Sequence, residues 1–266
     1  MQYIPHEYQK YATEKIIELP ACALFMEMGL GKTVSTLTAI NELIYDRFEV
    51  QKVLVIAPYR VADDTWTTEA DKWDHLKHLR VSKVLGTSGE RIAALEADAD
   101  IYVINRENVT WLVNLTGKEW PFEMIVVDEL SSFKSNSAKR FKSLRIVRPL
   151  ARRFVGLTGT PAPNGLLDLW PQVYLIDRGE RLGKTYTGYK DRYFLPDRRN
   201  GFVVYSWTPK EGAKEAIEQK LSDICISMKA DDYLNLPAQI VNDVYVSMDR
   251  HEMRKYRELE KEKLLE

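Results

Sequence analysis

The segment "ALFMEMGLGKT" (23–33) ends in residues that could hold a phosphate chain. Phosphate-binding loops of the form GxxxxGK[ST] need a strand, a tight glycine turn with inward-facing N–H groups and a helix N-terminus. Here two glycines supply the turn, Lys32 a charge for the β- and γ-phosphates, and Thr33 a hydroxyl for Mg²⁺. Met26 stands where the first glycine is usual, so the segment alone leaves open an apolar strand that runs into GKT by chance.

Two adjacent carboxylates, Asp128 and Glu129, follow the apolar run "MIVV" farther along the chain. One carboxylate can hold Mg²⁺ while the next polarises the attacking water. An acid pair at a helix N-terminus is also favoured by the helix dipole, so the pair alone does not decide the matter. The GKT motif and the carboxylate pair each follow an apolar run, and they occur in the chain order that a nucleotide site requires. Together they predict a site for ATP and Mg²⁺.

A third motif, "LTGTP" (157–161), places Thr158 and Thr160 on either side of Gly159. These hydroxyls could bond to the two carboxylates, or they could simply satisfy a turn. The residues alone leave both interpretations open.

The elements that would position these motifs are short apolar strands. Strand–helix alternation predicts an α/β fold, a mostly parallel sheet with helices on both faces. Ligands of such sheets bind at the carboxyl ends of the strands, where all three motifs fall. The runs that suit strands buried on both faces are 22–26, 52–58, 101–105, 124–129 and 153–159.

The alternation fades after about Asn164. Residues 177–202 are polar and aromatic and indicate an irregular insertion or subdomain, and 210–227 indicate a helix, so we expect a smaller irregular and helical insertion near the C-terminal end. The charged tail from Asp249 indicates another helix. We therefore expect three parts: an ATP-binding lobe at 1–175, an accessory subdomain packed on it at 176–236, and a linker at 237–266.

Composition sets limits on location and partners. The net charge of -1 favours no anionic partner overall, so any nucleic-acid surface must be local. Two cysteines cannot form a disulfide framework and are expected to be buried apolar residues in a reducing compartment. The start lacks the apolar core of a signal peptide, and no apolar run reaches the ~18 residues that a bilayer span needs. We expect a cytoplasmic location, or a DNA-associated one in the nucleoid or nucleus.

One local surface is strongly basic: residues 134–153 contain eight Lys and Arg residues and no acidic residue. Such a run can bind nucleic-acid phosphates, with a steep dependence on salt. It is also typical of a solvated helix face, with Phe141 and Leu144 buried on the other side. The candidates for DNA contact are Lys139, Arg140 and Lys142.

Together these motifs resemble those of superfamily 2 helicase-type ATPases, and more closely the Swi/Snf-type DNA translocases. "MEMGLGKT" differs by one residue from that family's "DEMGLGKT", so the missing glycine is a family trait. "DELSSFKSN" resembles "DEAH-x-IKN", with Leu130 and Ser131 where the family often has Ala and His. "VLVIAPYRVADDTWTTEADKW" resembles motif Ia and its following helix, "GLTGTPAPN" resembles motif III, and "LNLPAQIVNDVYVSMDRHEMRKY" resembles the link toward a second lobe.

The resemblance implies a RecA-like P-loop lobe and roles for single residues. Lys32, Asp128 and Glu129 would be catalytic, and Thr33 and Asp128 would hold the metal. Thr158, Gly159 and Thr160 would couple nucleotide state to nucleic acid. Gln9, in "HEYQ", resembles the Q motif and would read the adenine edge, although an amphipathic helix also explains a glutamine there. The nucleotide contacts would be Gln9, Met28, Gly29, Leu30, Gly31, Lys32, Thr33 and Val34, and further nucleic-acid candidates are Pro58, Arg60, Asn105 and Arg106.

The function implied is that of a DNA-dependent ATPase that moves on duplex DNA. The alternatives are an ATP-gated DNA or protein clamp without turnover, and an RNA helicase of the same superfamily. Relatives complete the ATP site with arginines of a second RecA-like lobe, and no motif after Pro237 supplies them. We therefore expect a monomeric fragment of a longer protein that is nearly inactive alone.

Overall fold

The computed structural model describes residues 1–162, 165–197, 199–200, 203–228 and 249–263. The chain divides into two compact units, Met1–Tyr233 and Leu234–Glu266, which are described separately. No helix among the described residues is long and apolar enough to cross a membrane.

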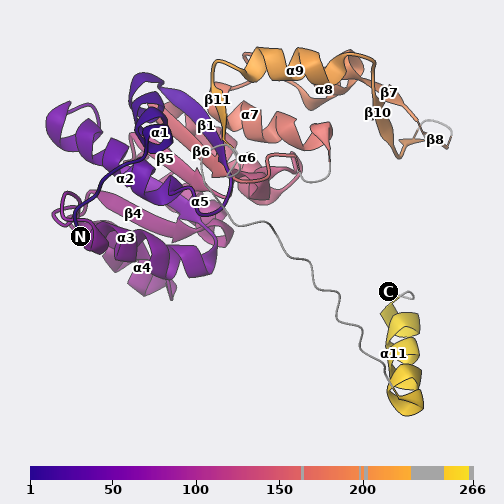
Figure 1. The fold of residues 1–266 in the computed structure, drawn as a ribbon, viewed down its shortest axis with the longest axis horizontal. Coiled ribbons are helices and arrows are strands. Elements are labelled where there is room, and N and C mark those ends of the chain that lie inside the picture. Colours follow the sequence, from indigo (N-terminus) through magenta and orange to yellow (C-terminus); the bar gives the residue numbers. More distant parts are fainter. Residues whose placement is uncertain (163–164, 198, 201–202, 229–248, 264–266) are drawn as a thin grey trace. The chain divides into compact units, whose positions relative to one another are not determined.

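A seven-stranded parallel sheet forms the centre of the first unit, with the strand order β11-β1-β6-β5-β2-β4-β3 (Figure 1). Its inner strands are uninterrupted apolar runs, as strands covered on both faces require. The predicted RecA-like sheet is therefore confirmed. Its strands are β1 (Ala21–Met26), β2 (Val53–Ala57), β3 (Val81–Val84), β4 (Ile101–Asn105), β5 (Met124–Asp128), β6 (Arg153–Thr158) and β11 (Cys225–Met228).

The register of three neighbouring strands brings the motifs together. On β6, Leu157 pairs with Asp128 of β5, and Thr158 pairs with Phe25 of β1. The carboxyl ends of β1, β6 and β5 therefore lie side by side, although their sequences are far apart. This arrangement puts GKT, DE and LTGTP at one edge of the sheet.

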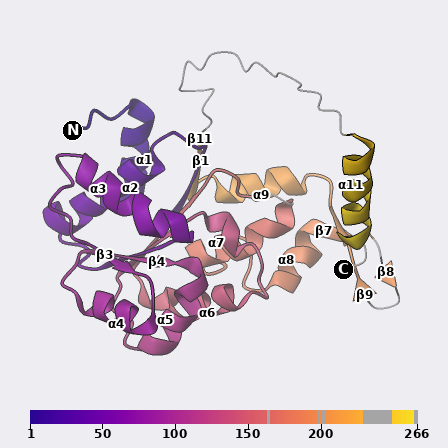
Figure 2. The same cartoon turned by 90° about the horizontal axis from the view of Figure 1, so that it is seen from below.

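Helices cover both faces of the sheet (Figure 2). On one side α1 packs on α2 and α2 on α3, and on the other α5 packs on α6 and α6 on α7. Two π-helical segments, Glu42–Asp46 and Val61–Thr65, adjoin α2 and α3. The helices are α1 (Glu7–Glu18), α2 (Lys32–Asn41), α3 (Trp66–Lys72), α4 (Ser88–Glu96), α5 (Val109–Thr116), α6 (Lys139–Val147) and α7 (Leu169–Asp177), with 3₁₀ turns at Arg106–Asn108, Leu130–Phe133, Arg148–Leu150 and Leu166–Asp168.

The segment expected to be irregular contains regular structure. The helix α8 (Tyr186–Tyr193) is capped by Thr185, whose hydroxyl accepts the Gly188 N–H, and its Tyr186 packs on Trp170. The expectation of an irregular segment is wrong at these positions because aromatic packing onto the lobe stabilises a short helix. Two antiparallel pairs follow, β7 (Phe194–Pro196) with β10 (Trp207–Pro209) and β8 (Arg199–Asn200) with β9 (Val203–Val204).

The helix expected over 210–227 ends early. The helix α9 covers Ala213–Leu221, and Cys225–Met228 form β11, the edge strand paired with β1. The prediction of helix is wrong there because a short apolar run pairs with the open edge of the sheet. Residues 176–236 thus include a strand of the main sheet, and the boundary between lobe and accessory subdomain remains a prediction.

The second unit contributes one described helix, α11 (Arg250–Lys263). The helix predicted for the charged tail is confirmed there. The first part of the expected linker, up to residue 248, lies outside the described residues, as does most of the segment that resembles the link to a second lobe.

Candidate nucleotide site

The predicted phosphate-binding loop connects β1 to α2, which begins at Lys32. Gly29 and Gly31 have φ values of 84° and 79°, in the left-handed region that glycine adopts without strain. A Cβ at Gly31 would also lie 2.4 Å from Nε2 of Gln9, so a larger residue there would displace the Gln9 side chain. The loop thus presents a tight turn and a helix N-terminus, which together favour an anion.

Lys32 folds back over this loop. Its Nζ donates to the carbonyl oxygens of Met26 at 2.8 Å and of Glu27 at 3.2 Å. Burial lowers the pKa of Lys32, while the negative charges of Asp128 and Glu129 act in the opposite direction. The ammonium group therefore lies near both carboxylates and holds only neutral oxygens, which a phosphate can replace.

Asp128 ends β5, and a buried tryptophan orients it. The indole Nε1 of Trp66 donates to Oδ2 of Asp128 at 3.0 Å. Burial raises the pKa of Asp128, and the Trp66 hydrogen bond and the charge of Lys32 partly offset that rise. The sequence predicts Trp66 only as a core residue, and its position in the "WTTEADKW" helix gives no sign of this contact.

Glu129 lies in a left-handed conformation with φ of 63°, which is unusual for a residue with a side chain. Its Oε1 accepts a hydrogen bond of 2.6 Å from the hydroxyl of Thr158 and another from the hydroxyl of Ser131. Thr158 is fully buried, and its own Oγ1 accepts from the Thr160 N–H at 3.2 Å. LTGTP is thereby joined to the carboxylate pair through Thr158; its role in coupling remains a prediction.

A pocket of about 490 Å³ adjoins the loop on the side of α1 and α3. In it, Gln9 ties the N-terminal segment to the loop: Oε1 accepts from the His6 N–H at 3.0 Å, and Nε2 donates to the Leu30 carbonyl at 3.3 Å. Contact between Gln9 and adenine remains a prediction. The lining adds residues that the sequence did not indicate, and consists of Tyr3, Ile4, His6, Gln9, Met28, Gly29, Gly31, Lys32, Thr33, Val34, Thr65, Glu69, Lys72 and Trp73.

Aromatic rings wall this pocket. The ring of Tyr3 stacks on His75 at 5.1 Å and meets Trp73 edge-on at the same centroid distance. A flat, partly exposed aromatic wall beside a phosphate-binding loop suits a heterocyclic base.

The nucleic-acid candidates differ in accessibility. Lys139 and Lys142 are exposed on α6, and Arg60 is exposed beyond β2 next to the half-buried Pro58. Arg140 is half-buried with its guanidinium over the Phe133 ring.

The side chains of Asn105 and Arg106 are less available for contact with nucleic acid. Asn105 is buried, and its amide bonds to Glu107 at 2.9 Å and to Asn108 at 2.6 Å. Arg106 pairs with Glu107 at 2.9 Å. The nucleic-acid proposal therefore does not depend on Asn105.

The basic run is not one surface. Arg153 is buried and donates to the carbonyls of Ile16, Ile17 and Leu19. Arg148 is buried as well. Arg148 and Arg153 therefore do not belong to an exposed nucleic-acid surface, because each closes the end of a neighbouring helix.

Fold and site together define a RecA-like nucleotide-binding lobe of the helicase type. The chain belongs to the SNF2 family: the model of the SNF2-related domain matches residues 8–266. The resemblance to Swi/Snf-type proteins is thereby confirmed.

The chain is also similar to individual proteins and to one solved structure. The chain is 37% identical over 270 residues to putative protein p41 of Acyrthosiphon pisum secondary endosymbiont phage 1, covering 99% of this chain and 59% of that protein. It is 28% identical to the bovine DNA annealing helicase and endonuclease ZRANB3, over 82% of this chain and 20% of the relative. The Sulfolobus solfataricus SWI2/SNF2 ATPase core in complex with dsDNA shares the fold, with a TM-score of 0.72 at 23% identity, covering 97% of this chain and 52% of that one. The chain thus spans little more than half the length of the phage relative.

Proposed function

We propose that this chain is the ATP-binding lobe of a DNA-dependent ATPase that couples hydrolysis to movement on duplex DNA. One observation carries the proposal: the loop, Lys32 and the carboxylates of Asp128 and Glu129 converge at the carboxyl ends of adjacent strands. That is the constellation that phosphoryl transfer to water requires.

The residues present fit ATP and Mg²⁺. The loop turns through Gly29 and Gly31 into the N-terminus of α2, and the hydroxyl of Thr33 and the carboxylate of Asp128 are the hard oxygen donors that Mg²⁺ prefers. When bound, Mg²⁺ neutralises charge on the phosphates. Lys32 would orient the β- and γ-phosphates, and Glu129, held by Thr158, would orient the attacking water.

Contact with DNA is supported by exposed cations and by the family. Lys139 and Lys142 lie on α6, which follows the carboxylate pair closely in the chain. A DNA-associated location, in the cytoplasm or a nucleoid, is consistent with this proposal.

The lobe would need a second one for turnover. Among the described residues that line the nucleotide pocket the cations are Lys32 and Lys72, and none is an arginine. A clamp that binds ATP without hydrolysing it is therefore the second candidate for these 266 residues. The intact Glu129, which a clamp does not need, favours the ATPase.

Binding measurements test the proposal. Fluorescence anisotropy would compare labelled duplex DNA, single-stranded DNA and duplex RNA of equal length, with and without ATP–Mg²⁺. We expect duplex DNA to bind most tightly and its affinity to change with ATP only when Lys32 is intact. A preference for RNA would instead support the RNA helicase, and no binding to any of the three would contradict the proposal.

A further inference from the structure

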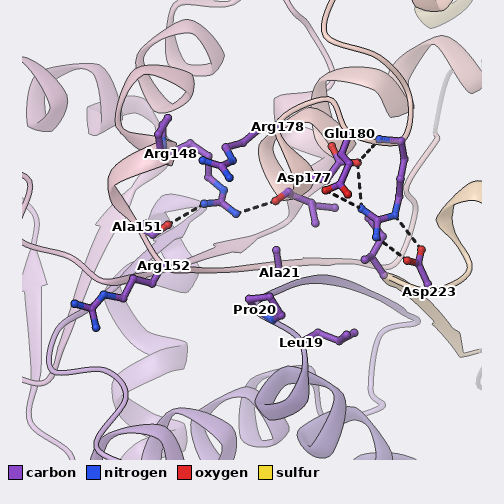
Figure 3. A pocket seen from close by; sticks show the side chains of 14 residues that line it. Leu19, Pro20, Ala21, Arg148, Ala151, Arg152, Asp177, Arg178, Glu180 and Asp223 are labelled. Atoms are coloured by element: carbon purple, nitrogen blue, oxygen red, sulfur yellow. Dashed lines mark hydrogen bonds and ion pairs between the residues drawn. The ribbon is translucent and has the colours of Figure 1, made fainter.

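Figure 3 shows a second pocket, of about 480 Å³. Its lining residues place it at the opposite edge of the sheet from the nucleotide site. Its walls come from the residues that precede β1, β6 and β11, which are the amino ends of these strands, and from the turn after α7. Four arginines and three carboxylates line it: Arg148, Arg152, Arg178 and Arg181, and Asp177, Glu180 and Asp223.

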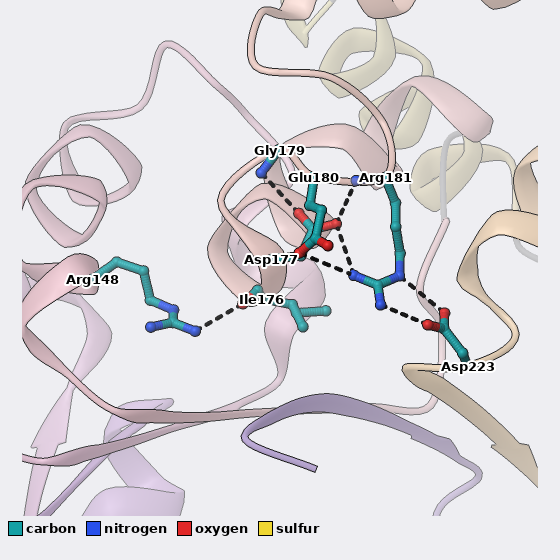
Figure 4. A network of polar contacts seen from close by, with 7 residues as sticks. All are labelled: Arg148, Ile176, Asp177, Gly179, Glu180, Arg181 and Asp223. Carbon is teal, nitrogen blue, oxygen red and sulfur yellow. Dashed lines mark hydrogen bonds and ion pairs between the residues drawn. The ribbon is translucent and has the colours of Figure 1, made fainter.

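The three carboxylates all pair with a single arginine (Figure 4). Arg181 contacts Asp177 at 3.5 Å, Glu180 at 3.8 Å and Asp223 at 2.6 Å. Asp177 also accepts the backbone N–H groups of Gly179 and Arg181, each at 2.8 Å. The three carboxylates of the pocket are thus all paired with Arg181, and these contacts link the end of α7 to the residues just before β11.

The other three arginines have no ion-pair partner among the described residues. Arg148 is only 5% exposed, and its guanidinium donates to the carbonyls of Leu175, Ile176 and Ala151. Three of its five N–H donors are used, so two remain. Burial and, to a smaller extent, the nearby positive charge of Arg178 lower the pKa of Arg148 to about 10, while the negative charge of Asp177 acts in the opposite direction.

Arg152 and Arg178 are exposed and line the same pocket, so they can turn toward a common ligand. Arg178 lies directly after α7 in a left-handed conformation with φ of 58°, where a glycine would be easier. A buried cation that has only neutral partners is costly, and a second cation beside it adds repulsion. An anion between the guanidinium groups would relieve both effects.

We propose that this pocket binds a phosphate-type dianion through Arg148, Arg152 and Arg178. Guanidinium groups match the oxygens of phosphate in a bidentate manner, and several of them around one anion suit a double charge better than a single one. A terminal phosphate or pyrophosphate therefore fits better than one phosphodiester of nucleic acid. This inference does not depend on the proposed ATPase activity.

Inorganic pyrophosphate is the probe, titrated by calorimetry into the Lys32→Ala variant so that the nucleotide loop does not contribute. We expect one site, which Arg152→Gln with Arg178→Gln should weaken by about tenfold or more for each arginine. The matched control is Lys77→Gln with Lys118→Gln, which removes the same charge outside the pocket and should leave the affinity unchanged. Arg148 is left intact because its bonds to three carbonyls support the fold.

Circular dichroism and the melting temperature would show that each variant is folded. Displacement of pyrophosphate by a short duplex would assign the site to nucleic-acid phosphates, and its failure to displace would assign the site to a free phosphate compound. No binding in the Lys32→Ala protein, or equal binding after loss of Arg152 and Arg178, would overturn the proposal.

Discussion

The indole N–H of Trp66 donates a 3.0 Å hydrogen bond to the carboxylate of Asp128, across 62 residues of sequence. The Trp66 ring is fully buried, so it cannot turn away from this contact. The bond stabilises the charged form of Asp128 in a place where burial favours the protonated form. Trp66 is therefore a positioning residue for the proposed metal ligand.

Trp66→Phe should weaken Mg²⁺-dependent nucleotide binding, because Asp128 loses the donor that orients it. Loss of such a partner of a metal ligand typically costs about 10- to 100-fold in metal affinity. The measurement is the Mg²⁺ concentration at half-maximal ATP-dependent thermal stabilisation. Trp120→Phe is the control, since the buried indole nitrogen of Trp120 has no hydrogen-bond partner among the described residues. An equal Mg²⁺ requirement in both variants would contradict the positioning role.

The same binding should depend on pH through Asp128. Its pKa is raised by burial, so protonation begins at a higher pH than for an exposed aspartate. The carboxylate form holds the metal, and binding should therefore be intact above this raised pKa and lost as pH falls through it. In Trp66→Phe the midpoint should move to higher pH, because the hydrogen bond that lowers the pKa is gone. Mg²⁺-dependent ATP binding across a pH series would measure the shift, and an unmoved midpoint would argue against it.

Lys32→Ala should abolish stabilisation by ATP–Mg²⁺. A ligand stabilises the folded state by RT ln(1 + [L]/Kd), which is about 2.7 kcal/mol at a hundredfold excess over Kd. The variant loses the ammonium group that the carbonyl oxygens of Met26 and Glu27 hold at the loop. Differential scanning fluorimetry with and without ATP tests this, with the exposed Lys77→Ala as control. If ATP raised the melting temperature of Lys32→Ala as much as that of the unmodified protein, the assignment of this loop as phosphate-binding would be wrong.

The triple variant Lys139→Ala, Arg140→Ala, Lys142→Ala should bind duplex DNA more weakly and with a shallower salt dependence. Each phosphate contact that is lost should reduce the slope of log K against log salt by about 0.9. The control removes three exposed lysines elsewhere, namely Lys10, Lys77 and Lys118. Equal affinity and slope in the two triple variants would indicate that the basic side of α6 is a solvated helix face and does not contact DNA.

Residues 1–266 should turn ATP over near background, with or without DNA. The charge that develops on the γ-phosphoryl oxygens needs a cation from the far side, and an arginine there contributes about 10³–10⁵ in kcat. The described lining of the nucleotide pocket contains no arginine. Steady-state phosphate release measures this directly. DNA-stimulated multiple turnover that Glu129→Gln abolishes would contradict the prediction and place the arginine within this chain or a second copy of it.

Some of the site could be read from the sequence because its determinants are local. Gly29 and Gly31 permit a turn that few other residues adopt, and Lys32 and Thr33 follow at a fixed spacing. The apolar runs before GKT and DE likewise predicted buried parallel strands, since only a sheet covered on both faces requires them. These inferences need no knowledge of distant contacts.

Other features depend on which segments the fold brings together. The sequence predicts helix at the edge strand Cys225–Met228. Four apolar or small residues do not by themselves favour strand over helix, and pairing with the open edge of β1 decides their conformation. Arg148 and Arg153 look like the exposed cations beside them in sequence. The fold buries them because each meets the free carbonyls of another segment.

The sequence by itself determined the fold class, through the alternation of apolar strands with helices, and it located the GKT loop and the carboxylate pair, because each of these motifs lies within a few neighbouring residues. Only the tertiary structure decided that Trp66 orients Asp128, that Thr158 holds Glu129, and that Arg148 shares a pocket with Arg178. The physical reason is range: a hydrogen bond or a shared desolvation cost depends on positions in space, and residues far apart in a chain are brought together only by the packing of the whole sheet.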